Sequence, residues 1–438
     1  MDFSFLGFKR AVSRDFLKNT SGLAYDWVNK KEFSRILRAI GADKKHLRIE
    51  DTFEFLKCRM DEHYYREMFK SQARAMYFAS THFPAYSFII AEDLAEDWLA
   101  CVDFHKQHAR DHSLHQPLTA YIVAELLGYG NSAKSLRIPA APGNLLDFCV
   151  AHLFDSTSII VEEARMWGFP ETLLSDSLCG RDYWKDLFYG TALISSLFHD
   201  IGYPWQYVGR ITSSLEKCVE GFPFGKLETR EILDAFGERL VLRPFHHYLR
   251  SFKMDPIQER GRLEKLVKAA MGTHGLPGAL AFLSLNDSIR DFPAPTTGAL
   301  INDFAMEWAA MGIMMHDMVD LSKSAEGNGL GLDFIKDPLS SIVAFADYLE
   351  EFNRPSVKFS SYPNKSELSY GTSCKSVQVS TDAQRNLVIT MQYNTPEELV
   401  LARSFKEKET EDYFNRSSGF IDMSGLGIEN VLFNAKSS

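Results

Sequence analysis

A histidine is followed directly by an aspartate, His199-Asp200, at the end of an apolar run of the chain. An imidazole nitrogen and a carboxylate oxygen can bind one divalent metal ion, which lowers the pKa of its water enough to give a hydroxide nucleophile near neutral pH. Neighbouring side chains on a helix diverge by about 100°. Both therefore reach one ion only where a helix ends, and Gly202 and Pro204 predict that end. The alternative is a buried histidine that is hydrogen-bonded to a helix-end aspartate.

Two distant segments offer further metal ligands. The segment Arg-Asp-His-Ser-Leu-His at 110–115 opens an apolar stretch, in which His115 would share a helical face with Leu118 and Ile122. His112 is the alternative first ligand. If His115 is the ligand, His112 is expected to contact a metal ligand or the substrate. Asp347 interrupts the apolar face of a helix predicted near 338–349, and a buried lone carboxylate is costly unless it is paired or coordinated.

The order His, His-Asp, Asp resembles the HD-domain metal-dependent phosphohydrolase superfamily over about residues 105–355. In that family four residues from separate helices meet around one metal, which corresponds here to His115, His199, Asp200 and Asp347. The resemblance implies one or two divalent ions, with Mn²⁺, Mg²⁺ and Fe²⁺ as candidates, because mixed imidazole and carboxylate ligands suit transition metals better than Ca²⁺.

Two further histidines, His274 and His316, lie between the pair and the last aspartate. Some HD branches bind a second metal with histidines in such positions, and others direct them at phosphate oxygens. Asp200 would then bridge two ions, so Asp200, His274 and His316 are the candidate catalytic residues. The alternative for each histidine is a hydrogen-bonded core residue.

Mechanistically, the resemblance implies in-line attack on phosphorus in a nucleotide substrate. The size and helical texture are most similar to the deoxynucleoside triphosphate triphosphohydrolase branch, which releases triphosphate. The segment from Gly202 to Trp205 departs from that branch's usual pattern. Two alternatives stay open: a phosphodiesterase for a cyclic or oligonucleotide signal, and a catalytically silent HD module that binds a nucleotide or a protein. By family analogy we also expect a nucleotide effector, a homo-oligomer and a role in nucleotide-pool control, including antiphage defence if the source is bacterial.

Substrate contacts are expected beside the ligand segments. Arginine and lysine side chains are the candidates for binding phosphate, although each could equally be a solvated surface charge. Tyrosine side chains are the candidates for stacking on a base, although each could equally be a core residue. With His112 they form the predicted substrate-binding set: Arg110, Arg210, Lys336, Arg354, Tyr203 and Tyr348.

Composition limits the other functional classes. The chain has 438 residues, 45% of them hydrophobic, and a net charge of −10, which argues against long-range attraction to nucleic acid. Its six cysteines have no Cys-x-x-Cys spacing and are expected to be reduced. The N-terminal pattern is not that of a signal peptide, and no apolar stretch approaches the length of a membrane span, so a cytoplasmic protein is expected.

Hydrophobic patterning predicts a mainly α protein, and the resemblance implies an HD-type helical bundle at its core. We expect an N-terminal helical region at 1–104, the metal phosphohydrolase domain at 105–355 and a small α+β region at 356–438. Helices are predicted at 117–128, 143–167, 211–242 and 255–271 and in the run that ends at His199, with loops at 285–300 and 322–333. The glycine-rich second loop is either a lid over the site or a surface connection. In the C-terminal region we expect strands at 377–380, 387–393 and 431–433, a turn at 382–386 and a helix opened by Thr395 and Pro396.

Overall fold

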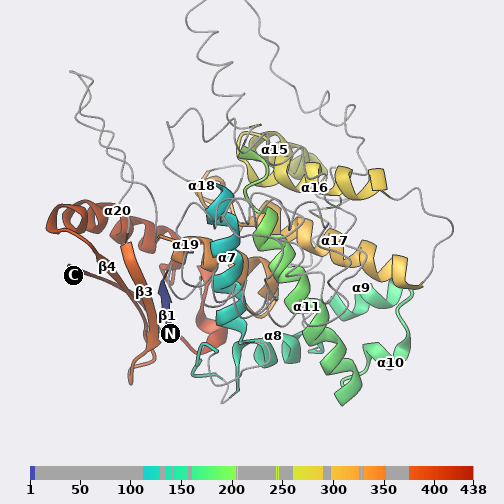
Figure 1. The fold of residues 1–438 in the computed structure, drawn as a ribbon. Helices are drawn as coiled ribbons and strands as arrows, with labels where there is room; N and C mark the ends of the chain where they lie inside the picture. Colours follow the sequence, from blue (N-terminus) through green and yellow to red (C-terminus); the bar gives the residue numbers. More distant parts are fainter. Residues whose placement is uncertain are drawn as a thin grey trace, which may run out of the picture.

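The computed structural model describes residues 1–4, 112–128, 135–140, 143–155, 160–203, 205, 243, 245, 260–289, 297–324, 327, 330–351 and 374–437. Within these ranges the chain forms a mainly helical core with a small C-terminal region that contains strands (Figure 1), as the hydrophobic patterning predicted. Most of the predicted N-terminal helical region and the predicted helix at 211–242 lie outside the described residues.

The helical core is built around α11, a 21-residue helix that packs against α7, α8, α17 and α19 (Figure 1). Nearly every side chain of α11 from Leu187 to its end is buried, as expected of a helix surrounded by other helices. The core helices are α7 (His112–Leu127), α8 (Leu145–Leu153), α9 (Ile160–Met166), α10 (Glu171–Leu174), α11 (Leu178–Phe198), α15 (Arg260–Ala270), α16 (Gly275–Ile289), α17 (Thr297–Met315), α18 (Val319–Ser322) and α19 (Pro338–Leu349).

Aromatic packing fixes α11 against α17. The ring of Trp184 lies 6.0 Å from that of Trp308 and 6.1 Å from that of Phe304, measured between centroids in edge-on arrangements. Phe188 also meets Trp308 edge-on, at 5.7 Å. Such pairs add stability beyond the apolar area they bury. This layer holds the two helices that end at His199 and His316 in a fixed relation.

The C-terminal region is a four-stranded sheet, in the order β1-β3-β4-β6, with one long helix. Strands β3 (Cys374–Thr381) and β4 (Leu387–Tyr393) form the predicted antiparallel hairpin, whose turn holds Arg385 at a positive φ of 64°. Helix α20 (Pro396–Phe414) then connects β4 to the parallel strand β6 (Val431–Ser437). The predicted helix start is confirmed, because the Thr395 side chain accepts a hydrogen bond from the Glu398 amide in a capping box.

The first residues of the chain belong to this C-terminal sheet. Strand β1 (Asp2–Ser4) pairs with β3, and Phe3 is buried with its ring edge-on to Tyr121 of α7, at 6.4 Å. A three-residue strand is too short to be recognised from its pattern. Phe3 therefore joins the sheet to a helix that carries one of the candidate metal ligands.

A second pairing joins the same two parts of the protein. Strand β2 (Leu332–Asp333) runs parallel to β5 (Ile421–Asp422), and the Leu332 amide donates to the Phe420 carbonyl at 2.7 Å. These residues end the segment that the sequence predicted as a loop and candidate lid. That end of the segment is hydrogen-bonded into the C-terminal region, while residues 325–326 and 328–329 of the loop lie outside the described residues.

Two of the predicted element boundaries need correction. The helix predicted at 143–167 is two helices, α8 and α9, and the loop predicted at 285–300 is wrong at both ends, because α16 continues to Ile289 and α17 begins at Thr297. The prolines that suggested the loop stand between these helices and do not interrupt either of them. In the described ranges no helix is long and apolar enough to cross a membrane. Cys149, Cys179 and Cys374, the described cysteines, are free thiols as predicted.

Candidate metal centre

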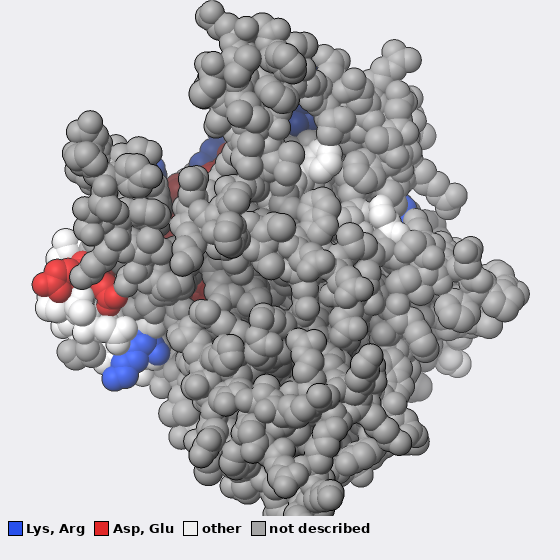
Figure 2. All heavy atoms as spheres, turned by 45° about the horizontal axis from the view of Figure 1, so that its top comes forward, with Lys and Arg blue, Asp and Glu red and all other residues white. Residues whose placement is uncertain are grey.

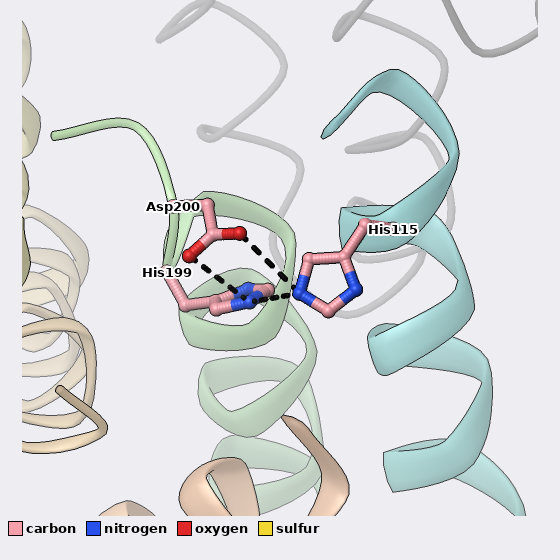
Figure 3. Close-up of side chains that lie close together, drawn as sticks. All are labelled: His115, His199 and Asp200. Carbon is pink, nitrogen blue, oxygen red and sulfur yellow. Dashed lines mark hydrogen bonds and ion pairs between the residues drawn. The ribbon is translucent and has the colours of Figure 1, made fainter. Parts of the chain in front are cut away.

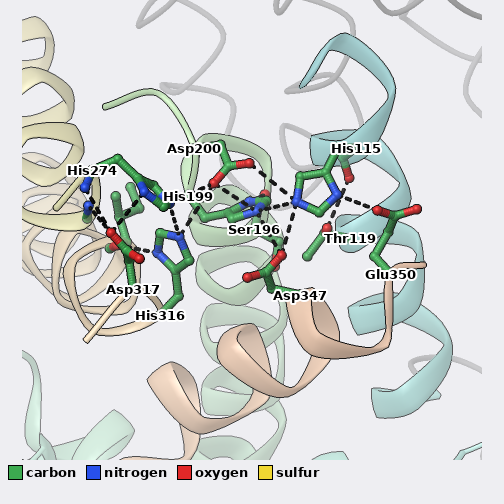
Figure 4. Close-up of polar contacts among 12 residues, drawn as sticks. His115, Thr119, Ser196, His199, Asp200, His274, His316, Asp317, Asp347 and Glu350 are labelled. Carbon is green, nitrogen blue, oxygen red and sulfur yellow. Dashed lines mark hydrogen bonds and ion pairs between the residues drawn. The ribbon is translucent and has the colours of Figure 1, made fainter. Parts of the chain in front are cut away.

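Six histidine and aspartate side chains from five parts of the chain meet in the helical core (Figure 4). They come from α7, the end of α11, the residue before α16, the residue after α17, and α19. None of the six is more than 8% exposed. They are His115, His199, Asp200, His274, His316 and Asp347, which are the six metal-ligand and catalytic candidates of the sequence.

The end of α11 explains how neighbouring residues reach the same place. The helix ends at Phe198, and His199 is its C-cap. Beyond it the hydrogen bonds tighten to three-residue spacing, with the Ile201 amide on the Phe198 carbonyl and the Tyr203 amide on the Asp200 carbonyl, both at 3.1 Å. The predicted helix end is thus confirmed, and it allows both side chains to point into the cluster.

Gly202 brings the segment of His274 against this turn. A Cβ atom on Gly202 would lie 1.9 Å from the His274 carbonyl oxygen and 2.5 Å from the Gly278 amide nitrogen. Only a residue without a side chain permits this approach of two backbones. The glycine that the sequence interpreted as a helix breaker therefore also sets the distance between α11 and α16.

Four of the six side chains form one group of potential ligands, the first subsite. His115 Nε2 lies 3.1 Å from His199 Nε2 and 3.3 Å from Asp200 Oδ2 (Figure 3). Asp347 Oδ1 lies 3.0 Å from His115 Nε2 and 3.6 Å from His199 Nε2. These are the four residues that the HD resemblance assigned to a single ion.

The remaining histidines form a second subsite on the other side of Asp200. His274 Nε2 lies 3.0 Å from His316 Nε2 and 3.1 Å from Asp200 Oδ1, and His316 Nε2 lies 3.5 Å from the same oxygen. Asp200 thus directs Oδ2 at His115 of the first subsite, while Oδ1 faces both histidines of the second subsite and also lies 3.4 Å from His199 Nε2 (Figure 4). A carboxylate in this position is able to bridge two metal ions.

Hydrogen bonds to the outer nitrogens fix the rings of two histidines. His199 Nδ1 lies 2.6 Å from the Ser196 carbonyl oxygen, and His316 Nδ1 lies 2.6 Å from the Ile313 carbonyl oxygen. A carbonyl oxygen only accepts, so Nδ1 carries the hydrogen in both rings. In the neutral imidazole Nε2 then presents its lone pair, which is the form that binds a metal.

Carboxylates orient the other two histidines. Glu350 Oε2 is paired with His115 Nδ1, and Asp317 Oδ2 lies 2.9 Å from His274 Nδ1. Asp317 also accepts from the His274 backbone amide at 2.8 Å. Ring nitrogens of metal-binding histidines are usually held in this way by a carboxylate or a carbonyl. All four imidazoles therefore meet the requirement for metal ligands, and each turns Nε2 inward.

Sequence reasoning missed both Glu350 and Asp317. Each had a usable signal: Glu350 follows Asp347 by three residues and so lies on the same side of a helix, and Asp317 follows His316 as Asp200 follows His199. A buried histidine that coordinates through Nε2 needs an acceptor for Nδ1, which is a reason to search for such residues.

The electrostatics of the cluster favour positive charge between its side chains. Burial lowers the pKa of His199 and keeps it neutral. For His274 burial also lowers the pKa, but the charge of Asp317, the electrostatic interaction with Tyr203 and hydrogen bonds to Asp200 and Asp317 outweigh it, so the pKa lies well above its usual value. A cation beside Asp200 is thus stabilised, whether it is a proton or a metal ion.

The predicted substrate residues are placed less uniformly. Tyr203 stacks on the His274 ring, with centroids 3.9 Å apart and an interplanar angle of 19°. Lys336 is largely exposed and lies 3.3 Å from Asp333. Tyr348 is buried, and its hydroxyl lies 2.6 Å from the Thr410 hydroxyl, so it takes the core position that was its alternative. Arg110, Arg210 and Arg354 lie outside the described residues, as does the side chain of His112.

Comparisons with known proteins find no match to a family model, to a curated protein or to a solved structure. The site itself is a buried set of imidazole and carboxylate ligands that is suited to one or two metal ions.

Proposed function

We propose that the protein is a metal-dependent phosphohydrolase of the HD type with two adjacent metal subsites. The proposal rests on one observation, the convergence of four histidine Nε2 atoms on the two oxygens of Asp200. His115, His199, Asp200 and Asp347 would hold one ion, and Asp200, His274 and His316 would hold the second. Transition metals such as Mn²⁺ and Fe²⁺ suit these ligands, and Mg²⁺ remains a candidate.

A bound divalent metal supplies Lewis acidity toward a phosphoryl oxygen and a water of lowered pKa. The protein's own contribution is orientation. Glu350 and Asp317 hold the rings of His115 and His274, while the backbone carbonyls of α11 and α17 hold the other two. Because these groups are already positioned and buried, little reorganisation is needed when charge develops on phosphorus.

The proposed substrate is a nucleotide, and deoxynucleoside triphosphates are the first candidates because of the resemblance of size and helical texture. The reaction would then release triphosphate. A nucleotide effector, a homo-oligomeric assembly and a role in nucleotide-pool control, including antiphage defence in a bacterial source, belong to the same proposal and rest on family analogy alone.

The second subsite favours another candidate, the cleavage of a phosphodiester in a cyclic or oligonucleotide signal. Two metals that share one carboxylate act on both the attacking and the leaving oxygen of an in-line displacement. His274 and His316 are within 3.5 Å of the shared Asp200 oxygen, so the ligands for a second ion are in place.

Product analysis tests both candidates. The intact protein is incubated with Mn²⁺ or Mg²⁺ and a panel of deoxynucleoside triphosphates, cyclic nucleotides and short oligonucleotides, and the products are separated by chromatography. Triphosphate supports the first candidate, and a linear nucleotide or monophosphate supports the second. His199→Ala and Asp200→Ala should abolish either activity. Metal uptake and nucleotide binding without turnover under any metal or effector would instead favour the silent module and overturn the enzymatic proposal.

A further inference from the structure

The end of α19 makes contacts on two faces, through residues that alternate along the sequence. Asp347 and Glu350 reach His115, with Asp347 Oδ1 at 3.0 Å from Nε2 and Glu350 paired with Nδ1. Tyr348 and Glu351 face the other way and contact α20 of the C-terminal region. Asp347 and the C-cap residue Glu350 are three positions apart and share a side of the last turn, whereas Glu351 follows the end of the helix. Contacts that hold Tyr348 and Glu351 on the second face therefore also restrict the positions of Asp347 and Glu350 on the first.

A buried lysine holds that second face. Lys406 of α20 is 4% exposed, and its Nζ lies 2.5 Å from Glu351 Oε1 and 2.6 Å from Glu409 Oε2. Nζ also donates to the Tyr348 carbonyl oxygen at 3.2 Å and lies 4.4 Å from the centroid of the Tyr348 ring. The last carbonyls of a helix have no partner within it, so this bond satisfies one of them.

The same contact is supported from both sides. The Tyr348 hydroxyl lies 2.6 Å from Thr410 Oγ1, four residues after Lys406, and the Cys374 amide at the start of β3 donates to the Glu351 carbonyl at 3.0 Å. The outer side of α20 is solvated and carries both charges, with Glu397, Arg403, Glu407, Lys408 and Glu411 exposed. In Figure 2 acidic and basic side chains lie near one another at the left edge of the molecule. Lys408 on this helix is exposed, which makes Lys406 the buried member of a closely spaced pair.

We infer that Lys406 is a positioning residue for the metal centre: the C-terminal region holds the end of α19 so that Asp347 and Glu350 meet His115. This inference rests on the proposed metal-binding function. A buried ammonium that pairs with a carboxylate and a helix-end carbonyl leaves little freedom to the turn it contacts. The α+β region then contributes to metal affinity although it supplies no ligand to the described cluster.

The test measures Mn²⁺ binding to the full chain by calorimetry. Lys406→Met alone would leave Glu351 as a buried, poorly compensated charge, so the decisive variant is the double change Lys406→Met with Glu351→Gln, which removes both charges at similar volume. Lys408→Met is the matched control. Thermal melting of the metal-free proteins and the visible spectrum of the Co²⁺ forms are recorded beside each titration.

We expect the double variant to fold and to bind Mn²⁺ about tenfold more weakly, with an altered Co²⁺ spectrum, because groups that orient metal ligands typically affect affinity by 10–100-fold. The control should match the wild type in every measurement. A lysine with a purely structural role would lower the melting temperature and leave affinity and spectrum unchanged, and that result overturns the inference.

If the double variant fails to fold, Glu351→Gln alone decides, because it keeps an oxygen for Lys406 Nζ while removing one charge. It should weaken Mn²⁺ binding by roughly threefold, which is less than the change of 10-fold or more that is typical when an orienting group is removed completely. Unchanged affinity would contradict the inference. A wild-type protein that takes up no Mn²⁺ overturns the proposed function together with the inference. If the wild type binds Mn²⁺ and the folded variants bind it equally well, the inference is overturned and the proposed function is not.

Discussion

His199 Nε2 lies 3.6 Å from Asp347 Oδ1, although the two residues belong to helices far apart in the sequence. Two ligands that each lie about 2.1 Å from one metal are roughly 3.4 Å apart in tetrahedral geometry. The observed separation is close to that value and suits a shared ion. The His-Asp pair and the aspartate of α19 are the two segments that the sequence singled out most strongly, and the structure brings them to one place.

The division of the cluster into two subsites predicts metal stoichiometry. His274→Ala removes a side chain that groups with Asp200 and His316 alone, so the protein should fall from two bound Mn²⁺ to one, as measured by elemental analysis and calorimetry. Asp200→Asn weakens both subsites, because this carboxylate faces histidines of both, and should lose both ions. Loss of both ions in His274→Ala, or of neither in Asp200→Asn, would contradict the shared-carboxylate arrangement.

Glu350 is predicted to set the affinity of the first subsite. Glu350→Gln keeps the shape of the side chain but weakens the acceptor for His115 Nδ1, so Mn²⁺ affinity should fall by about tenfold with little change in fold. The exposed Glu397 of α20 offers a control, Glu397→Gln, which should bind as the wild type does. Equal affinities in the two variants would show that His115 needs no support from Glu350.

The candidate site could be predicted from sequence because its chemistry is local in two places. His199-Asp200 combines two ligand types at a helix end. Asp347 interrupts an apolar helix face, where a carboxylate is costly to bury unless it is paired or coordinated. His115, His274 and His316 were recognisable by their place in the order of ligands. The choice of His115 followed from its shared face with Leu118 and Ile122, since a helix buries only one such stripe.

What escaped prediction depends on contacts between distant segments. Tyr348 is adjacent to a ligand, yet its direction is set by Thr410 and Lys406, which lie on a helix of the C-terminal region. Phe3 joins a sheet whose other strands begin at Cys374. Neither pairing has a periodic signal, because a strand of three residues or a single buried lysine leaves no pattern in its own neighbourhood.

Removal of metal should lower the stability of the folded protein. Without an ion the carboxylates of Asp200 and Asp347 and the inward nitrogens of the histidines lie close together in a buried site, and an ion that binds only the folded state stabilises it by mass action. At a concentration 100 times its dissociation constant the effect is about 2.7 kcal/mol for one site. The melting temperature should therefore fall after chelation and rise again with added Mn²⁺. A melting temperature that is indifferent to both would count against a metal in this cluster.

Phe3 is predicted to be a strong point of attachment between the sheet and α7. It is 1% exposed and packs on Tyr121, so Phe3→Ala leaves a cavity and should cost about 3–5 kcal/mol of unfolding free energy. Urea unfolding monitored by circular dichroism gives the value. Leu432→Ala on β6 serves as the control, because this side chain is 42% exposed and its truncation should cost far less. A similar small loss in both variants would mean that β1 adds little to the fold.

Gly202 should tolerate no side chain, because of the backbone it faces. In Gly202→Ala the new Cβ would stand 1.9 Å from the His274 carbonyl oxygen, so the turn after Asp200 or the start of α16 must move. Such overpacking typically costs 1–3 kcal/mol, and here the shift falls on a residue that places a ligand. We expect lower stability in urea and a loss of the second Mn²⁺ before the first, since His274 belongs to the second subsite. Gly261→Ala is the matched control, because nothing lies within 4 Å of its Cβ position. If Gly202→Ala kept both ions and the stability of that control, the close approach of α11 and α16 would not be what aligns His274 with Asp200.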